Sequence, residues 1–235
     1  MNKLLIDAFE KLNIPADDMK ISRFKAYCDF LLEKNRVTNL TAIDEPTQVY
    51  IRHFIDSVSL LSLYDFKNKS MIDIGSGAGF PGLALKIAEP SLKITLLDSN
   101  GRKVEFLREV CGLLGLADVT CVQARAEELA REPGFREGYD IAAARAVAEL
   151  SALCELALPF VSPGGVFFAM KAFDSLDEIN RAQNAIEKLG GRLLGKKDYT
   201  LFATDRQNSA VIIEKATATP GIYPRKFAKI KKTPL

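Results

Sequence analysis

The chain has 235 residues, of which 48% are hydrophobic and 26% are charged, and its formal net charge at pH 7 is +2. This size and composition are typical of a globular protein with one well-buried domain and an accessory segment, and the net charge indicates no particular class of partner. No run approaches the ~20 uncharged apolar residues that cross a bilayer, so the sequence excludes a transmembrane protein and we expect no membrane partner.

The N-terminal sequence MNKLLIDAFEKLNI carries Asp7 and Glu10 within its apolar spacing, which favours an amphipathic helix over a secretory signal. The four cysteines are scattered and include no C-x-x-C pair. We therefore expect buried thiols of a reducing compartment, neither a disulfide framework nor a metal site, and a cytoplasmic location.

Helical patterns fill residues 1–69. Apolar residues recur at spacings of three and four over Leu4–Leu12, Ile21–Leu32 and Val49–Leu61. Pro46 suits the first turn of the third helix. We therefore expect a helical N-terminal extension.

From residue 70 onwards, short apolar strands alternate with helical patterns. The strands are expected at Met71–Ile74, Ile94–Leu97, Val119–Val122, Ile141–Ala144 and Val166–Met170, and the helices at Leu83–Ala88, Val104–Leu114, Leu150–Leu158 and Leu176–Leu189. Strands that are apolar throughout and separated by helices indicate a parallel sheet covered on both faces, which is an α/β fold.

The end of the chain departs from this alternation. Leu193–Phe202 and Ala210–Glu214 are strand-like runs with no helix between them, so a hairpin places a final antiparallel strand in the sheet. We expect this domain to cover residues 70–215. Residues 216–235 contain five basic residues and no acid, which is typical either of a solvated disordered tail or of a phosphate-contacting arm.

A glycine-rich loop follows the first strand directly. Gly75, Gly77 and Gly79 permit a sharp turn and a close approach of a ligand to the backbone. The G-x-G-x-x-G pattern from Gly77 is a weak signal that nicotinamide and flavin proteins share. Asp73 extends it to D-x-G-x-G-x-G, which resembles the first motif of class I methyltransferases. An acid there acts on the cationic methionine end of S-adenosylmethionine, directly or through water, and repels a pyrophosphate.

Asp98 ends the second strand, 23 residues after Gly75. That is the expected place for a carboxylate that accepts hydrogen bonds from both ribose hydroxyls of a nucleotide. A glycine-rich turn without a ligand is the alternative, and the joint occurrence of loop, helix start and acid disfavours it. The sequence therefore predicts S-adenosylmethionine as the cofactor.

Further motifs carry a closer resemblance. They are NLTAI at Asn39–Ile43, RHFIDS at Arg52–Ser57, DIGSGAGFPG at Asp73–Gly82, LLDSNGRKVEFL at Leu96–Leu107, RAEE at Arg125–Glu128 and ARAVA at Ala144–Ala148. Together they resemble the bacterial small-subunit ribosomal RNA guanine-N7 methyltransferases, also called glucose-inhibited division protein B. The resemblance covers roughly Asn35 to Lys171, and the tail YPRK…PL is similar to the family's ending.

The resemblance implies a Rossmann-like class I methyltransferase that modifies a guanine in the 530 loop of 16S ribosomal RNA. It implies cofactor contacts at Gly75 and Phe80, at Ala126 and Glu127, and at Arg145, to which the loop pattern adds Gly77. The implied partner is 16S ribosomal RNA or the small ribosomal subunit, and we expect a monomer.

The expected chemistry needs no general base, because N7 of guanine has an unprotonated lone pair at neutral pH. Positioning of the two reactants would supply most of the acceleration. Enzymes that methylate exocyclic amines usually carry a D/N-P-P-aromatic motif after the fourth strand, where this chain has AAARA at Ala142–Ala146. Cys154 lacks the neighbouring proline of cytosine-C5 enzymes. Arg145 is the catalytic candidate: it holds a phosphate, holds the cofactor carboxylate or orients guanine through O6, and we favour the last.

Basic residues near the carboxyl edge of the predicted sheet are candidates for RNA contact, since phosphate binding needs a cluster of charges. They are Arg102, Lys103, Arg125, Lys171 and Arg206. Each alone is more often a solvated surface charge.

His53 is the single histidine, and we expect a packing residue hydrogen-bonded to Asp56 one helical turn away. The alternative is a contact that braces the cofactor loop. The side chain of Phe80 is expected to form a wall of the cofactor site.

Three rival functions remain open at this point. The first is a class I methyltransferase that acts on another RNA, a protein or a small molecule. The second is a nicotinamide-binding oxidoreductase. The third is a non-catalytic RNA-binding module, against which the intact loop and Asp98 argue.

Overall fold

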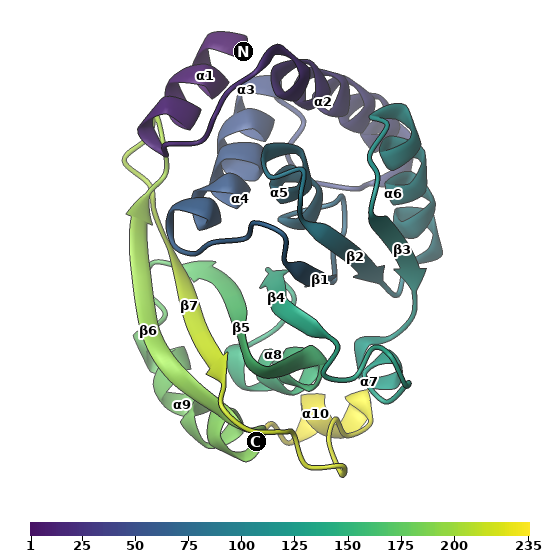
Figure 1. Ribbon diagram of the computed structural model, residues 1–235, viewed down its shortest axis with the longest axis vertical. Coiled ribbons are helices and arrows are strands. Elements are labelled where there is room, and N and C mark those ends of the chain that lie inside the picture. Colours follow the sequence, from purple (N-terminus) through teal and green to yellow (C-terminus); the bar gives the residue numbers. More distant parts are fainter.

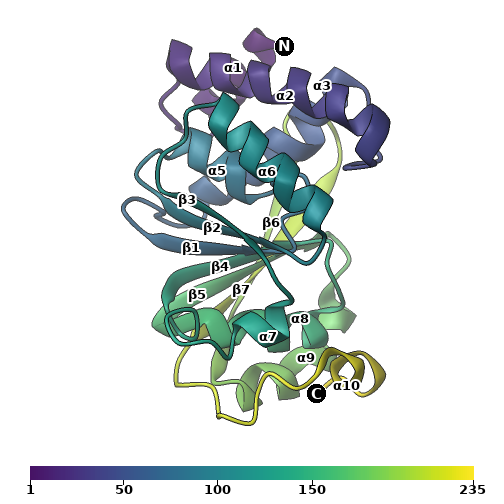
Figure 2. The same cartoon turned by 90° about the vertical axis from the view of Figure 1, so that its right-hand side faces the viewer.

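A computed structural model describes all 235 residues, and a seven-stranded sheet runs through its middle in the order β3-β2-β1-β4-β5-β7-β6 (Figures 1 and 2). The five strands β1 to β5 are parallel, and β7 is antiparallel to both of its neighbours, β5 and β6. The predicted α/β class and final antiparallel strand are confirmed. The strands are β1 (Ser70–Ile74), β2 (Lys93–Asp98), β3 (Val119–Gln123), β4 (Tyr139–Arg145), β5 (Val161–Ala172), β6 (Gly191–Thr200) and β7 (Gln207–Lys215).

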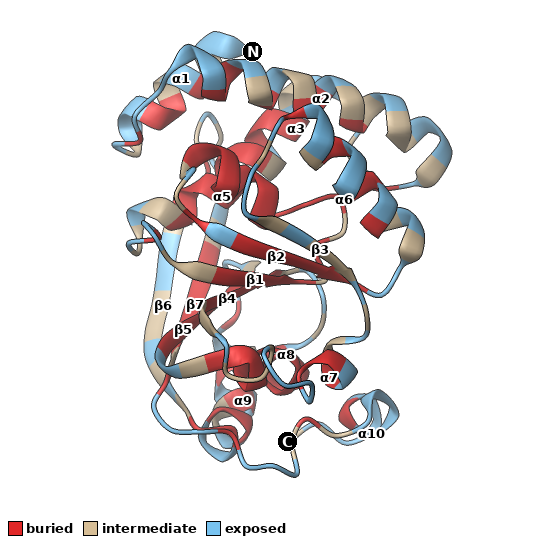
Figure 3. Cartoon of the chain, turned by 45° about the vertical axis from the view of Figure 1, so that its right-hand side comes forward, coloured by how far each residue is buried: buried red, intermediate tan, exposed pale blue.

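Helices cover both faces of the sheet, which is why its central strands are apolar on both sides (Figure 2). One face is covered by α1 (Asn2–Lys11), α2 (Asp18–Thr38), α5 (Gly82–Ala88) and α6 (Gly101–Leu113). The other face is covered by α7 (Ala126–Leu129), α8 (Leu150–Ala157), α9 (Leu176–Lys188) and α10 (Phe227–Lys232), and a 3₁₀ turn (Leu158–Phe160) follows α8. Figure 3 shows the buried residues concentrated where these layers meet.

The third predicted helix is a composite. It begins as α3 (Pro46–Val49), widens to a π-helical turn (Tyr50–Ile55), returns to α4 (Asp56–Val58) and ends in a 3₁₀ turn (Ser59–Ser62). The side chain of Glu45 caps its start by accepting the backbone N–H groups of Thr47 and Gln48. π-Helical turns recur at functional sites, and this one carries Arg52 and His53.

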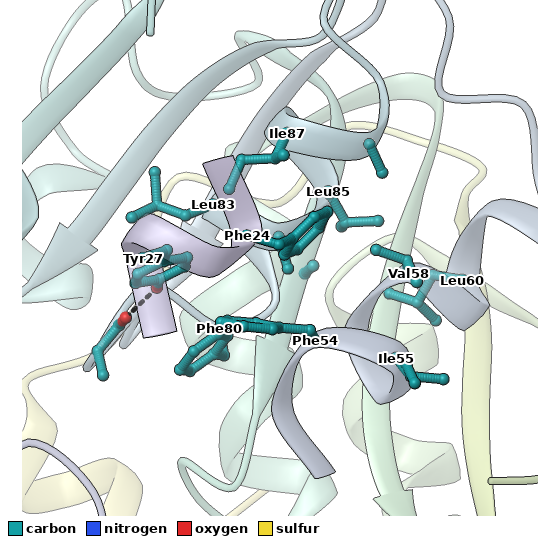
Figure 4. Close-up of a cluster of buried hydrophobic side chains, with 14 of the residues drawn as sticks. Phe24, Tyr27, Phe54, Ile55, Val58, Leu60, Phe80, Leu83, Leu85 and Ile87 are labelled. Carbon is teal, nitrogen blue, oxygen red and sulfur yellow. Dashed lines mark hydrogen bonds between the residues drawn. The ribbon is translucent and has the colours of Figure 1, made fainter. Parts of the chain in front are cut away.

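The N-terminal helices share a hydrophobic core with the sheet. Phe24 and Tyr27 of α2 pack against Phe54, and Tyr27 also stacks on Phe80 of the glycine loop (Figure 4). The Tyr27 hydroxyl donates a hydrogen bond to the backbone carbonyl of Ala78 within that loop, drawn as the dashed line. The helical layer therefore holds the loop from one side of the sheet.

The basic tail is a packed segment. It ends in α10, where the side chain of Ile230 is fully buried against α8. The first of the two expectations for this tail, a solvated disordered segment, is therefore wrong. No helix of the chain is long and apolar enough to cross a membrane, and no cluster of three potential ligand side chains is arranged to hold a metal ion.

Candidate functional site

Two cavities open side by side at the carboxyl ends of the parallel strands, where α/β sheets bind their ligands. The loop cavity, of about 320 Å³, lies over the ends of β1, β2 and β3. The hairpin cavity, of about 340 Å³, lies between the π-helical turn, the end of β5 and the β6–β7 hairpin. Arg145 and Ala146, at the end of β4, line both cavities. A group held in one cavity thus adjoins a group held in the other.

The backbone of the glycine loop requires its glycines. Gly75, Gly77 and Gly79 have φ values of +68°, +58° and +95°, in the left-handed region that other residues rarely adopt. A Cβ atom at Gly75 would also lie 2.8 Å from a methyl carbon of Val147. The amides of Gly75 and Ser76 both donate to the carbonyl of Leu97 on β2, at 2.8 and 3.0 Å. The loop is therefore held against β2, next to Asp98.

The carboxylate of Asp98 is held in place by backbone donors and is only 7% exposed. Its Oδ2 accepts the Gly77 N–H at 3.0 Å, and its Oδ1 accepts the Asn100 N–H at 2.8 Å. Each carboxylate oxygen has a second acceptor position, so Asp98 can still accept hydrogen bonds from a ligand in the loop cavity. This orientation suits the expected contact with two ribose hydroxyls.

Asp73 does not reach the loop cavity. It is fully buried, and burial raises its pKa to about 7. Oδ2 accepts the Gly82 N–H at 2.9 Å, and Oδ1 has no hydrogen-bond partner. Of the two expected routes to the cofactor, a direct contact has no support in this geometry, and the contact through water stays a prediction. Asp73 instead occupies the start of α5, where a dinucleotide pyrophosphate would bind, which argues against the nicotinamide alternative.

Five of the seven expected cofactor residues line the loop cavity: Gly75, Asp98, Ala126, Glu127 and Arg145. Gly77 does not line the cavity, but its backbone N–H donates a hydrogen bond to Asp98, which does.

Phe80 does not form the expected wall. Its ring is 4% exposed and stacks between His53, at a centroid distance of 4.5 Å, and Tyr27, at 5.4 Å. The sequence places Phe80 in the loop, but the aromatic helical layer draws its side chain away from the cavity.

Arg145 is fixed by a polar network beside the hairpin cavity. One terminal nitrogen donates to the Arg52 carbonyl at 3.0 Å and to Asp56 Oδ2 at 3.2 Å, and the other donates to His53 Nδ1 at 3.0 Å. The guanidinium carbon lies 5.1 Å from the centroid of the Phe80 ring. These contacts orient the guanidinium and leave its Nε–H and one terminal N–H without a protein partner.

Asp56 joins three distant segments. Its Oδ2 pairs with Arg145, and its Oδ1 accepts the Tyr199 hydroxyl at 2.9 Å and the Asn208 side-chain amide at 2.7 Å. Tyr199 and Asn208 are directly paired across the β6–β7 hairpin. Burial, followed by the nearby Asp56 charge, raises the pKa of Tyr199, so its hydroxyl stays a donor.

The predicted His53–Asp56 hydrogen bond is absent, because Arg145 takes the carboxylate. His53 Nδ1 faces the Arg145 guanidinium, and Nε2 lies 2.8 Å from the Thr41 hydroxyl. Burial and the Arg145 charge lower the pKa of His53 to about 3, so the ring is neutral at pH 7. Its stacking on Phe80 agrees with the alternative expectation that it braces the loop.

The five basic candidates separate into three groups. Lys103 and Arg125 line the loop cavity beside Asp98 and Glu127, at ion-pair distances of 3.9 and 3.8 Å. Lys171 and Arg206 line the hairpin cavity. The ammonium of Lys171 is already bonded to Glu178 at 2.5 Å, so its charge is paired within the protein. Arg102 is exposed on α6 and lines neither cavity.

The sequence analysis missed several cavity residues and, for Asp56, expected His53 as the partner. Asp56 lies within the RHFIDS motif, which signals it, although not as a partner of Arg145. Tyr199 and Asn208 belong to an ordinary hairpin pattern with no local signal. Phe227 of α10 lines the loop cavity, and only the family-like tail sequence pointed to that segment.

The loop cavity fits the expected cofactor. Its floor is apolar at Ile74 and Leu97, and Asp98 offers acceptors for a ribose. Glu127, in the first turn of α7 after β3, is 8% exposed and also lines the cavity. An apolar slot with a carboxylate at the end of β2 suits an adenosine-bearing ligand.

Comparisons with known proteins agree with this geometry. A family model described as rRNA small subunit methyltransferase G matches residues 20–201. The Ribosomal RNA small subunit methyltransferase G of Acetivibrio thermocellus is 44% identical over 235 residues, which are 100% of this chain and 97% of the relative. That of Alkaliphilus metalliredigens is 46% identical over 233 residues, which are 99% and 98%. Among solved structures, a SAM dependent methyltransferase from Aquifex aeolicus has a TM-score of 0.56 at 16% identity and covers 75% of this chain and 97% of its own, a likeness of fold alone.

Proposed function

Because the chain belongs to the rRNA small subunit methyltransferase G family, we propose that it transfers a methyl group from S-adenosylmethionine to N7 of a guanine in the 530 loop of 16S ribosomal RNA. The family and the α/β fold make it an S-adenosylmethionine-dependent rRNA methyltransferase. One observation of the structure carries the proposal furthest: two cavities, one suited to the cofactor and one open to an acceptor, meet at Arg145 and Ala146.

In this proposal the loop cavity holds the cofactor, which supplies an electrophilic sulfonium methyl group when bound. Asp98 accepts the ribose hydroxyls, and the Leu97 and Ile74 side chains support the apolar part. Because Gly75 has no side chain, the ligand can approach the backbone of the loop closely. Ala126 and Glu127 lie at the β3 end of the cavity, and Gly77 holds Asp98 in position.

The hairpin cavity receives the guanine base. Its N7 lone pair is unprotonated at neutral pH, so the chain needs to orient the base and exclude water rather than remove a proton. His53, which lines the hairpin cavity, is neutral and accepts a hydrogen bond from Arg145 at Nδ1. That nitrogen is therefore unavailable as a general base, in agreement with a reaction that requires none.

Arg145 has the role of a positioning donor in this proposal. A guanidinium that bound both O6 and N7 of guanine would block the acceptor atom, so the contact is to O6 alone, from the free Nε–H. Asp56 resolves the apparent conflict between a cationic arginine and a base that becomes cationic on methylation. Its carboxylate neutralises the guanidinium at 3.2 Å, so the pair adds little net charge beside the acceptor.

The contacts to the rest of the RNA are further parts of the proposal. Arg206 at the mouth of the hairpin cavity and the exposed Arg102 are placed to meet phosphates, whereas Lys103, Arg125 and Lys171 have carboxylate neighbours. We retain all five as candidate RNA contacts. We also propose that the chain acts in the cytoplasm as a monomer on 16S RNA or the small subunit, with residues 1–69, 70–215 and 216–235 as its three segments.

Methyl transfer to unmodified RNA tests the function. The chain is incubated with S-adenosylmethionine labelled in its methyl group and with 16S RNA or small subunits lacking the modification. We expect label in RNA, at a guanine whose N7-methylated base makes the strand cleavable by reduction and amine treatment. Label in another nucleotide would overturn the assignment. Absence of label in the RNA, together with binding of NADH, would also overturn it. A small subunit that accepts label when naked RNA does not would identify the assembled particle as the substrate.

A further inference from the structure

The C-terminal helix contributes an aromatic side chain to the loop cavity. Phe227, the first residue of α10, lines this cavity together with Asp98, Glu127 and Leu156. Its ring lies 5.5 Å from the guanidinium carbon of Arg125, and 38% of the residue is exposed. A large aromatic group on a short terminal helix is therefore presented to the cavity.

Buried polar contacts hold Phe227 in this place. Arg225 makes a bidentate ion pair with the fully buried carboxylate of Glu155 on α8. Its Nε–H donates to Oε1 at 2.8 Å, and a terminal N–H donates to Oε2 at 2.6 Å. The Arg225 backbone N–H donates to the same carboxylate at 2.7 Å. On the other side of Phe227, Ile230 is fully buried against Ala152 and Leu156. The ring is thus anchored from both sides along the chain.

The order of the strands indicates which end of the cofactor Phe227 meets. The cavity extends from the end of β4, at Arg145, across β1 and β2 to the end of β3, at Arg125. Methyl transfer takes place at the β4 end, where the two cavities meet, and Asp98 holds the ribose at β2. The base of the nucleoside therefore lies at the β3 end, beside the Arg125–Phe227 pair.

We propose that Phe227 forms the outer wall of the adenine subsite, so that the C-terminal segment is part of the cofactor site. This inference rests on the proposed cofactor but not on the RNA acceptor. Aromatic rings stack on nucleobases whatever the base, and the neighbouring Arg125 adds a cationic edge. Removal of such a ring typically costs a nucleobase ligand roughly 1–3 kcal/mol, which corresponds to a roughly five- to 150-fold loss of affinity.

Calorimetry on the full chain with Phe227→Ala tests the proposal. We expect the Kd for S-adenosylmethionine to rise within that range, and the Kd for adenosine to rise by a similar factor, because the lost contact is to the base. Phe227→Tyr keeps the ring and should bind as the original chain does. Phe173→Ala is the matched control, since Phe173 is 44% exposed, lies under a lysine (Lys196 Nζ at 4.4 Å) and lines neither cavity.

A second measurement reads the tail itself. Trypsin can cleave this segment after Lys226 and after three further lysines in α10. Cofactor should slow cleavage there in the original chain and in Phe173→Ala, and should give no protection in Phe227→Ala. Equal Kd values for Phe227→Ala and Phe173→Ala, or tail protection that persists in Phe227→Ala, would overturn the proposal. These readouts do not involve RNA, so a failure of the acceptor assignment leaves them interpretable.

Discussion

At the end of β4 a single guanidinium is bound by groups from two other parts of the chain, the π-helical turn and α4. Arg145 donates to the Arg52 carbonyl, to Asp56 and to His53, and its face lies over Phe80. An arginine held in this way cannot swing between cofactor and acceptor, so its free N–H groups point in fixed directions. In the proposed function, the surrounding residues contribute to catalysis by fixing the position of this one side chain.

Asp98→Ala should weaken cofactor binding and leave the fold intact. The variant loses the acceptor for the ribose and leaves the Gly77 and Asn100 amides to water. Hydrogen bonds to a charged group contribute about 1.5–3 kcal/mol, so we expect a roughly ten- to 150-fold rise in the Kd for S-adenosylmethionine by calorimetry. An unchanged Kd would remove Asp98 from the ribose subsite.

Asp56→Asn should slow methyl transfer more than it weakens cofactor binding. Asp56 lines only the hairpin cavity, so the Kd for S-adenosylmethionine should change less than about threefold, whereas kcat should fall at least about tenfold because Arg145 keeps an uncompensated charge beside a base that becomes cationic. Tyr199→Phe removes one hydrogen bond to the same carboxylate and keeps its charge. Single-turnover rates equal in the two variants would contradict the electrostatic role.

The low pKa of His53 predicts how stability depends on pH. The folded-state pKa is about 3 and the ordinary value is 6.5, so the unfolded state binds more protons between these values. His53 therefore contributes stability above pH 6.5 that is lost as the pH falls from 6.5 towards 3. Between pH 5.5 and 4 the free energy of unfolding should fall more steeply for the original chain than for His53→Gln, by up to about 1.4 kcal/mol per pH unit. Denaturant titrations in this range check the slope, and parallel curves would show that His53 accepts a proton in the fold.

Among the elements, α2 and the glycine loop are joined by one buried hydrogen bond. Tyr27 is fully buried, and its hydroxyl donates to the Ala78 carbonyl between Gly77 and Gly79. Its ring stacks on Phe80 in the same loop. A helix from the N-terminal layer thereby holds the glycine loop, of which Gly75 lines the loop cavity, so in the proposed function α2 supports the cofactor site indirectly.

Tyr27→Phe should reduce both stability and cofactor affinity. The variant keeps the stacking and leaves the Ala78 carbonyl without its partner, at a cost of about 1–3 kcal/mol in the free energy of unfolding. The freed loop should raise the Kd for S-adenosylmethionine, whereas Tyr139→Phe, which removes a half-buried hydroxyl bonded to Thr95 away from the loop, should leave that Kd unchanged. Calorimetry on both variants decides: equal Kd values for the two would mean that α2 supports the fold and not the loop.

The elements also show which parts of the site a local pattern reveals. The first two strands, the glycine loop and Asp98 follow one another within about 30 residues, and each leaves a signal of periodicity or spacing. Asp56, by contrast, meets Tyr199 and Asn208 across 143 and 152 residues of sequence. No periodic pattern encodes such a meeting, because it depends on how a hairpin at one end of the sheet packs against the N-terminal layer.

Over the whole molecule, the sequence predicts the sheet, its cover of helices and the antiparallel end strand. It mispredicts the direction of the Phe80 side chain and the partner of His53, since both are decided by competition within the packed aromatic layer. The prediction for the tail was ambiguous because lysines dominate its average composition. Two apolar residues, Phe227 and Ile230, nevertheless determine where the tail packs. In the proposed function, α10 near the C-terminus lines the loop cavity, and α2 near the N-terminus holds the glycine loop beside it.

The central claim, that N7 of guanine is the methyl acceptor and that no proton has to be removed from it, is tested most directly by changing that single atom. A short RNA carrying the target sequence is made twice, with guanine or with 7-deazaguanine, in which a C–H group replaces N7, at the modified position. The account predicts methyl transfer to the first RNA, none to the second, and binding of both with similar Kd values. Methylation of the 7-deazaguanine RNA at a comparable rate would contradict it.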